Sequence, residues 1–179
     1  MFDFVYRHKR ALQLVLALLI VPPFAFFGVD SYLRGDESAT TIPPDLSNVV
    51  SVAAGFSSTT ALHGDGTVRG WGGFNNDVGW VSNVPPAGLQ HVVNLAAGYD
   101  FILALRADGT VVAWGDGTYG QTNVPGGLNG VAAIACGAAH SIALHTNGTV
   151  VGWGDNGSGQ SDIPLGLQNV RSEEHTSEL

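Results

Sequence analysis

The hydrophobic and polar positions of this chain form one pattern that occurs three times. An apolar run ends at a glycine, a second apolar run follows, and a third, β-branched run ends in Trp-Gly. The copies at residues 55–71, 98–114 and 137–153 align without a gap, and their first glycines are 43 and 39 residues apart. A fixed period of about 40 residues indicates a repeat architecture.

Each copy predicts three short strands. The first strands are expected at residues 49–54, 92–97 and 131–136, the second at 59–62, 101–105 and 141–144, and the third at 67–71, 110–114 and 149–153. The structural positions of the repeat are its opening glycines (Gly55, Gly98, Gly137), its turn glycines (Gly66, Gly109, Gly148) and its tryptophans (Trp71, Trp114, Trp153). The turn glycines follow Asp or Asn, and such dipeptides accept the positive φ angles of tight hairpins. We expect the tryptophan rings in the core, filling the wedge between neighbouring sheets.

A polar, glycine-rich stretch follows each tryptophan, and a Val-Pro or Ile-Pro step then leads into the next apolar run. These stretches cover residues 72–83, 115–123 and 154–162, and the first has three extra residues. They read as loops, and proline keeps the following segment at a sheet edge or in a connection. Three or four strands per unit, stacked on the next unit, build a propeller blade or a β-solenoid coil.

The third copy carries a recognisable succession of motifs between Gly137 and Gln160. It reads Gly-x-x-His-Ser-x-Ala-Leu, Asn-Gly-Thr-Val-Val-x-Trp-Gly and then Gly-Gln. This succession resembles the bacterial form of the regulator-of-chromosome-condensation repeat, and the other two copies match it more loosely. The resemblance spans about residues 42–170 and implies a β-propeller. Because closed propellers have roughly 4–8 blades, we expect an all-β repeat domain with about three blades of an incomplete, open propeller.

The first 34 residues form a different module. A basic cluster at residues 7–10 precedes residues 11–29, whose only polar member is Gln13. This stretch is just long enough for a membrane-spanning helix, and the flanking charges place the N-terminus in the cytoplasm and the repeats outside. We therefore predict a transmembrane anchor with a helix at about 11–29, followed by a linker at 35–41. A cleaved signal peptide is the alternative, although no clear small-x-small cleavage site follows the apolar stretch.

The start of the chain also resembles a known family. Met-Phe-Asp-Phe-Val, the basic cluster and an apolar run ending in Phe-Phe-Gly-Val resemble the anchor of membrane-bound periplasmic parvulin-type peptidyl-prolyl isomerases of Gram-negative bacteria. No segment here corresponds to the parvulin domain, so no isomerase residue is carried over. Residues 171–179 leave the repeat and resemble a translated sequencing adapter, which predicts a non-native tail; a natural acidic tail is the alternative. The anchor and the repeats are then either a natural fusion or a chimera made during sequence assembly.

Charge and chemistry favour a scaffold over an enzyme. Residues 35–170 hold two arginines and no lysine against ten Asp and Glu residues, so they lack the basic patch that phosphate contacts require. His63 and His145 read as solvated strand ends, while His140 and Cys136 read as structural residues. Asp116 and Asp155 read as turn residues rather than metal ligands. We therefore predict no enzymatic activity, no catalytic residue, no cofactor, no metal and no nucleic acid partner.

These observations predict a membrane-anchored, extracytoplasmic propeller-type scaffold that binds an unidentified protein or ligand. It would lie at the bacterial inner membrane, with the lipid bilayer as a partner of the N-terminal helix and the repeats in the periplasm. Loops on rigid scaffolds often carry binding residues, so Phe74, Trp80 and Tyr119 in the loops after the tryptophans are the candidate contact residues. The alternative is an N-terminal fragment or chimera of a membrane-anchored peptidyl-prolyl isomerase or chaperone that lacks its catalytic domain.

Overall fold

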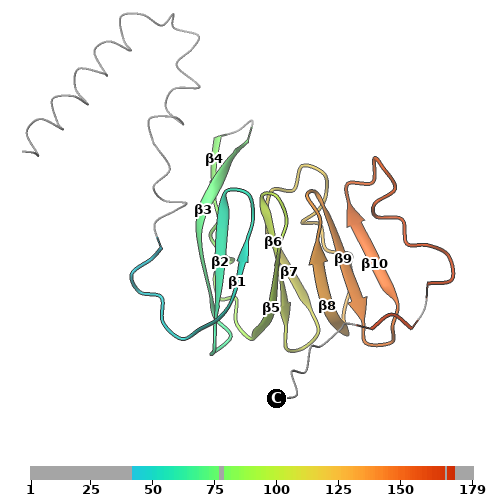
Figure 1. The fold of residues 1–179 in the computed structure, drawn as a ribbon, viewed down its shortest axis with the longest axis horizontal. Helices are drawn as coiled ribbons and strands as arrows, with labels where there is room; N and C mark the ends of the chain where they lie inside the picture. Colours follow the sequence, from blue (N-terminus) through green and yellow to red (C-terminus); the bar gives the residue numbers. More distant parts are fainter. Residues whose placement is uncertain (1–41, 77–78, 168, 172–179) are drawn as a thin grey trace, which may run out of the picture. The chain divides into compact units, whose positions relative to one another are not determined.

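Ten strands form three antiparallel sheets in the computed structural model, which describes residues 42–76, 79–167 and 169–171 (Figure 1). The strands are β1 (Val49–Ala54), β2 (Ser58–His63), β3 (Val68–Asn76), β4 (Gly79–Ser82), β5 (Val92–Ala97), β6 (Phe101–Arg106), β7 (Val111–Gly115), β8 (Val131–Cys136), β9 (His140–His145) and β10 (Val150–Gly154). Each sheet contains only consecutive strands, in the orders β1-β2-β3-β4, β5-β6-β7 and β8-β9-β10. We call these sheets blades 1, 2 and 3.

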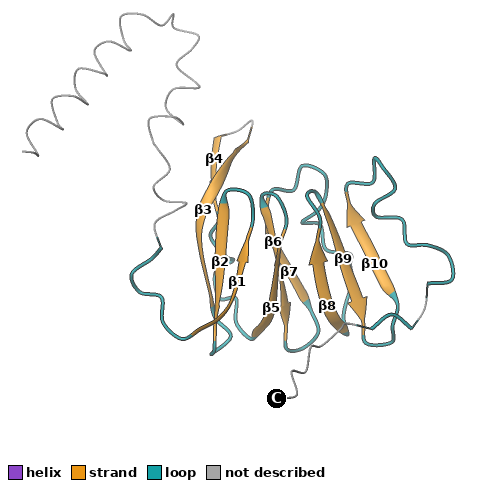
Figure 2. Cartoon of the chain, in the orientation of Figure 1, coloured by secondary structure: helices purple, strands orange, loops and turns teal. Residues whose placement is uncertain are grey.

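The predicted all-β repeat with three blades is confirmed. The first strand of every blade begins and ends at the residues that the sequence pattern predicts. For the second and third strands, most of the ends lie one residue away from the predicted position. The described residues form strands and loops (Figure 2), and none of their segments is a helix long and apolar enough to cross a membrane. The predicted helix at 11–29, the linker at 35–41 and the tail from 172 lie outside the described residues.

The turn between the second and third strands shows why each copy carries Asp-Gly-Thr or Asn-Gly-Thr. Gly66, the glycine of blade 1, has a φ of +80°, and its N–H donates to the His63 carbonyl at 2.9 Å. The Oδ1 atom of Asp65 accepts hydrogen bonds from the Thr67 hydroxyl at 2.6 Å and the Thr67 N–H at 2.9 Å. The same two bonds recur in the other blades, so only the glycine needs positive φ and the preceding residue acts through its side chain.

The core lies between the blades rather than within one of them. In β6, Ile102 and Ala104 face blade 1, whereas Phe101, Leu103 and Leu105 face blade 3, and all five are at most 4% exposed. This alternation follows from the two-residue period of a strand. Because blade 2 is covered on both faces, its middle strand is apolar at every position from Phe101 to Leu105.

The tryptophans of blades 2 and 3 fill the space between neighbouring sheets as predicted, whereas the tryptophan of blade 1 does not. Trp114 and Trp153 are each 8% exposed and pack in the clusters between blades 1 and 2 and between blades 2 and 3. Both side chains face the preceding blade. Trp71 is only half-buried, because among the described residues no sheet lies against the corresponding face of blade 1. The expectation that Trp71 is core is therefore wrong for this chain.

The polar stretch after Trp71 is not a loop. β3 continues to Asn76 and pairs with β4, with Phe74 opposite Val81 and Asn75 opposite Trp80. The prediction that this stretch is a loop is wrong, because the longer segment pairs with itself as a hairpin, whereas the contact role of Phe74 and Trp80 stays a prediction. Phe74 and Trp80 hence lie on strands that extend blade 1.

Candidate protein-contact surface

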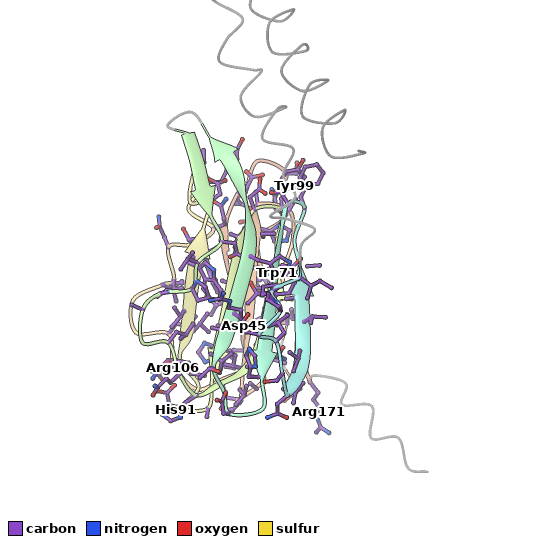
Figure 3. The ribbon with its side chains drawn as sticks, turned by 90° about the vertical axis from the view of Figure 1, so that its left-hand side faces the viewer. Asp45, Trp71, His91, Tyr99, Arg106 and Arg171 are labelled. Carbon is purple, nitrogen blue, oxygen red and sulfur yellow. The ribbon has the colours of Figure 1, made fainter. Side chains whose placement is uncertain are left out.

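The turns after the first strands and the loops after the third strands meet at one end of the blades. Backbone hydrogen bonds join them: Asp116 N–H donates to the Asp100 carbonyl at 2.8 Å, and Asp155 N–H donates to the Ala139 carbonyl at 2.9 Å. Figure 3 shows Tyr99 at this end and Arg106 and His91 at the opposite end. We call it the Tyr99 end, comprising the turns 55–58, 98–101 and 137–140 and the loops 116–123 and 155–162.

The opening glycine of each repeat fixes the shape of these turns. A Cβ atom on Gly98 would overlap the Phe101 ring, and one on Gly137 would overlap the His140 ring. On Gly55 a Cβ atom would lie 2.9 Å from the Gly98 carbonyl oxygen of the next blade. Glycine is therefore required by close packing, which places the following residue at the tip of the turn.

Adjacent turns are joined across the blades by backbone hydrogen bonds. Phe56 N–H donates to the Tyr99 carbonyl at 2.7 Å, and Tyr99 N–H donates to the Ala138 carbonyl at 3.0 Å. The Ser57 hydroxyl donates to Oδ1 of Asp100 at 2.8 Å. These bonds hold the three turn tips in a row.

The row carries an exposed aromatic pair. The rings of Phe56 and Tyr99 stack with centroids 4.2 Å apart and planes inclined by 11°. Phe56 is nevertheless 71% exposed and Tyr99 49% exposed. Sequence analysis did not single out this pair, although both residues directly follow an opening glycine, and that shared position was the available signal.

Tyr119 belongs to the same end and is 60% exposed. Its N–H donates to Oε1 of Gln121 at 2.9 Å, and Nε2 of Gln121 donates to Oδ2 of Asp116 at 2.9 Å. Oδ1 of Asp116 accepts from the Thr118 hydroxyl at 2.6 Å. The loop is therefore ordered by its own side chains, and the predicted turn role of Asp116 is confirmed.

Blade 3 repeats this arrangement. Asp155 accepts from the Gly157 N–H at 3.0 Å and from Nε2 of Gln160 at 2.6 Å. In the described parts of the chain, no group of three or more His, Cys, Asp or Glu side chains is arranged to hold a metal ion.

Aspartates supply the charge at the Tyr99 end, whereas the opposite end carries Asp65 and Asp108 as well as Arg106. The turns and loops of the Tyr99 end contain Asp100, Asp116, Asp155 and Asp162 but neither lysine nor arginine. Arg106 lies at the opposite end, where its Nε donates to the Gln90 carbonyl at 3.3 Å. The Tyr99 end thus combines exposed aromatic rings with carboxylates.

His63 and His145 end the second strands of their blades, also away from Tyr99. Both are half-buried rather than fully solvated, and Nδ1 of His63 lies 2.7 Å from the Ser47 carbonyl oxygen. His140 is half-buried beside Gly137. Among the described residues, none of the three histidines forms a hydrogen bond or an ion pair with another ionisable side chain.

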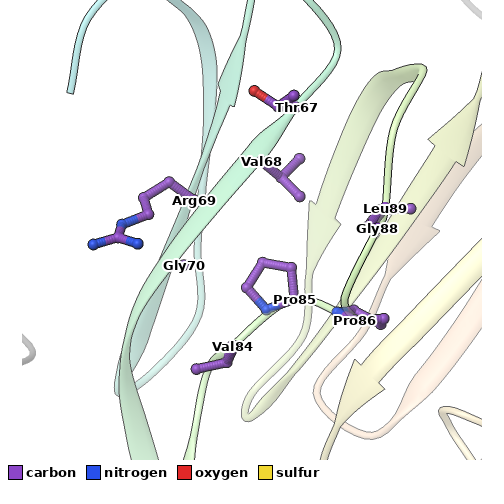
Figure 4. A pocket seen from close by; sticks show the side chains of 9 residues that line it. All are labelled: Thr67, Val68, Arg69, Gly70, Val84, Pro85, Pro86, Gly88 and Leu89. Atoms are coloured by element: carbon purple, nitrogen blue, oxygen red, sulfur yellow. The ribbon is translucent and has the colours of Figure 1, made fainter. Parts of the chain in front are cut away.

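A shallow pocket of about 250 Å³ lies along the outer strand of blade 1 (Figure 4). It runs between residues 67–70 and the connection at 84–89. Arg69 is its ionisable lining residue, and that side chain lies 3.8 Å from the exposed Asp45 carboxylate. The pocket therefore offers a proline-lined wall but no pair of groups suited to catalysis.

Cys136 packs at the edge of the cluster between blades 2 and 3 and is half-buried. Burial raises the pKa of its thiol to about 12, so the group stays protonated at neutral pH. A protonated thiol is a poor nucleophile, which agrees with the structural role predicted for this residue.

The repeated antiparallel blades of three or four strands, stacked face to face, define a β-propeller repeat protein. A family model described as the regulator of chromosome condensation (RCC1) repeat matches residues 49–79, 92–121 and 131–160. The chain therefore belongs to the RCC1 repeat family. No curated protein matches the chain significantly by sequence.

Solved structures share this fold. Prp20p from Saccharomyces cerevisiae is 30% identical with a TM-score of 0.57, and the match covers 68% of this chain and 34% of that one. Human WBSCR16 is 26% identical with a TM-score of 0.50, covering 64% of this chain and 35% of that one. The ectodomain of the receptor kinase CR4 from Physcomitrella patens is 26% identical with a TM-score of 0.50, covering 69% and 35%. The chain thus spans about a third of the length of the structures it matches.

Proposed function

We propose that this chain is a noncatalytic protein-interaction scaffold and that the Tyr99 end is its contact surface. The observation that carries the proposal is the stacked and exposed pair of Phe56 and Tyr99. Two blades contribute one ring each, and backbone hydrogen bonds fix the turns that present them. Rigid aromatic side chains on a preorganised surface are the residues that most often anchor protein partners.

The relatives support a protein as the partner. The structure of Prp20p is described together with its binding properties to Gsp1p and histones, and yeast RCC1 has been solved bound to Kap60. In the described part of this chain, Asp100 and Asp116 flank the aromatic pair and Tyr119, and the turns and loops of this end contain neither lysine nor arginine. A partner segment with an apolar anchor among basic groups fits this end, because opposite charges raise the association rate and select the partner.

The test compares partners recovered with the full-length chain and with the double variant Phe56→Ala, Tyr99→Ala. Truncating anchor aromatics costs more than about 1 kcal/mol each, so we expect recovery of the specific partner to fall at least about tenfold. The matched control is Leu165→Ala, which removes a side chain that is fully exposed elsewhere on the repeats. Quantitative mass spectrometry of affinity-purified samples measures the recovery, and the unfolding midpoint verifies that each variant is folded.

The proposal fails if the double variant keeps every partner at the level of the unmodified chain. Raised salt should also reduce recovery, because part of the attraction is between exposed charges. A partner that is lost with Leu165→Ala as well would identify a different surface.

We further propose that the repeats are tethered to a membrane by residues 11–29 and lie outside the cytoplasm. The support is the apolar stretch between a basic and an acidic flank. Alkaline extraction of membranes should leave the full chain in the pellet, and protease added to spheroplasts should degrade the repeats. Release of the intact repeats by extraction, or their protection from protease, would contradict this topology.

A further inference from the structure

Three Asn-Gly dipeptides lie in the described part of the chain, at residues 129–130, 147–148 and 156–157. Asn-Gly is prone to deamidation, because glycine has no side chain to obstruct the attack of its backbone nitrogen on the asparagine Cγ atom. The attack needs a nitrogen that is free of a hydrogen bond and a side chain that can turn toward it. The hydrogen bonds around each dipeptide therefore decide which of them can react.

The pair of Asn147 and Gly148 is protected by its turn. Gly148 N–H donates to the His145 carbonyl at 2.9 Å. Oδ1 of Asn147 accepts from the Thr149 N–H at 3.0 Å and from the Thr149 hydroxyl at 2.7 Å. These three hydrogen bonds must break before the nitrogen can attack Cγ, so the fold protects this dipeptide.

The pair of Asn156 and Gly157 is protected in a different way. Gly157 N–H donates to Oδ1 of Asp155 at 3.0 Å. The Asn156 amide is fixed at both ends, since Nδ2 donates to Oδ1 of Asp162 at 2.9 Å and Oδ1 accepts from the Ser161 N–H at 3.0 Å. Three hydrogen bonds again oppose the attack.

The pair of Asn129 and Gly130 lacks both forms of protection. Among the described residues, the Gly130 N–H donates no hydrogen bond and Oδ1 of Asn129 accepts none. Nδ2 of Asn129 donates to the Gly127 carbonyl at 2.8 Å, and this contact lies at the surface. Asn129 is exposed, so water reaches it. The attacking nitrogen, the amide and the water that deamidation requires are therefore available together at this dipeptide.

We propose that Asn129 is a deamidation site of the folded protein. The Gly130 nitrogen attacks Cγ of Asn129 as it loses its proton, the Cγ–Nδ2 bond breaks, and the side-chain nitrogen leaves with that proton as ammonia. The product is a cyclic imide. Water then opens the imide at one of its two carbonyl carbons, which leaves either aspartate or isoaspartate. The reaction consumes only water, and the inference is independent of the proposed contact surface.

The isoaspartate product would disturb the junction between blades 2 and 3, because it lengthens the main chain by one carbon atom directly before Gly130. Val131 N–H donates to the Gly109 carbonyl of blade 2 at 3.0 Å, and the Gly130 carbonyl accepts from the Thr146 N–H at 2.9 Å. These bonds fix the position of Val131, which is 5% exposed in the cluster between the blades. Isoaspartate should therefore lower the unfolding midpoint, whereas aspartate should leave it unchanged.

The repeat itself supplies variants that block the reaction. Asn129-Gly130 corresponds to Gln90-His91 in the preceding connection. Gly130 has a φ of +61° and His91 a φ of +58°, so this position accepts a side chain in the same backbone conformation. A Cβ atom on Gly130 would meet Oγ1 of Thr146 at 3.7 Å, an ordinary contact. Asn129→Gln requires a larger ring and Gly130→His obstructs the attacking nitrogen, and both variants should fold normally.

The test follows the conversion of the three asparagines in the full chain during incubation at about pH 8. Peptide mapping by mass spectrometry with electron-transfer fragmentation distinguishes aspartate from isoaspartate at each position. Each hydrogen bond that must break first slows the attack about fivefold, so Asn129 should convert at least about tenfold faster than Asn147 and Asn156. In urea that unfolds the chain, the three rates should become similar. A smaller difference in the folded chain would overturn the proposal.

Matched variants connect the modification with the junction. Asn129→Gln and Gly130→His should suppress conversion at this position, and incubation should then no longer lower the unfolding midpoint. Asn129→Asp carries the new charge on an unaltered main chain and should keep the midpoint of the fresh protein. An equal loss of stability on incubation of Asn129→Gln would show that isoaspartate at this position is not what weakens the junction.

Discussion

Replacing Asn83 tests whether a single polar side chain holds blades 1 and 2 together. Asn83 is 4% exposed and uses both ends of its amide. Nδ2 donates to the Thr59 carbonyl at 3.0 Å and to Oγ1 of Thr60 at 2.9 Å, while Oδ1 accepts from Nε1 of Trp114 at 2.7 Å. The side chain therefore links the end of the hairpin, the middle strand of blade 1 and the core of blade 2.

Asn83→Ala removes all three hydrogen bonds and leaves the Trp114 N–H buried without an acceptor. Each lost hydrogen bond lowers the free energy of unfolding by about 1 kcal/mol, so the three together lower it by about 3 kcal/mol. Counting the buried Trp114 donor at about 1–3 kcal/mol, with two weaker losses, gives a similar decrease. Trp114→Phe in the Asn83→Ala background should cost less than it does alone, because the stranded donor is already unpaired. The difference measures the coupling between the two residues.

The sequence supplies a matched control for this variant. Asn123 holds the same position before a Val-Pro step, but its side chain is exposed. Urea unfolding followed by tryptophan fluorescence measures both variants. Equal stability of Asn83→Ala and Asn123→Ala would refute the reasoning, since the difference between them rests only on the buried hydrogen bonds.

Three further perturbations address the turns and the buried thiol. Gly98→Ala should lower the free energy of unfolding by about 1–3 kcal/mol because its methyl group overlaps the buried Phe101 ring, whereas Gly126→Ala, which meets nothing within 4 Å, should be neutral or slightly stabilising in the same urea assay. Thr110→Val removes the main cause of the lowered pKa of Asp108, so the pKa should rise toward 3.8 in an NMR titration, and an unchanged value would contradict the assignment. In the native protein this hydrogen bond stabilises the fold above the unfolded-state pKa and stops doing so as the pH falls through the folded-state pKa. Because the pKa of Cys136 is raised to about 12, its alkylation by iodoacetamide at pH 8 should be about a thousandfold slower than that of an unfolded thiol, and a comparable rate would show that the thiol is not buried as described.

The strands of the blades could be predicted from the sequence because every blade repeats the same order of apolar, strand-forming runs and turn residues. Each first strand ends before a glycine that close packing requires, and each hairpin turns at Gly66 or its equivalent. Single glycines therefore mark the strand ends in the sequence. The same reasoning gave a wrong prediction for the stretch from Gly73 to Ser82, which was expected to be a loop. Its glycines and asparagines are typical of loops, but the pairing of β3 with β4 satisfies the backbone, and composition alone does not show which partner a segment finds.

The candidate contact surface was harder to predict than the blades, because its residues differ from one copy of the repeat to the next. Side chains packed between blades, such as those of Trp114 and Trp153, are the same in the copies, so the repeat is visible in the sequence. The residue at the tip of each turn, directly after the opening glycine, hydrogen-bonds to the neighbouring turns through its backbone. Its side chain can therefore vary, and the residue is Phe56, Tyr99 or Ala138 in the three blades. Freedom of the side chain at a fixed backbone position is what allows a scaffold to acquire a specific surface. Within a repeat protein, the informative residues for binding are therefore the variable ones at positions whose backbone geometry does not vary.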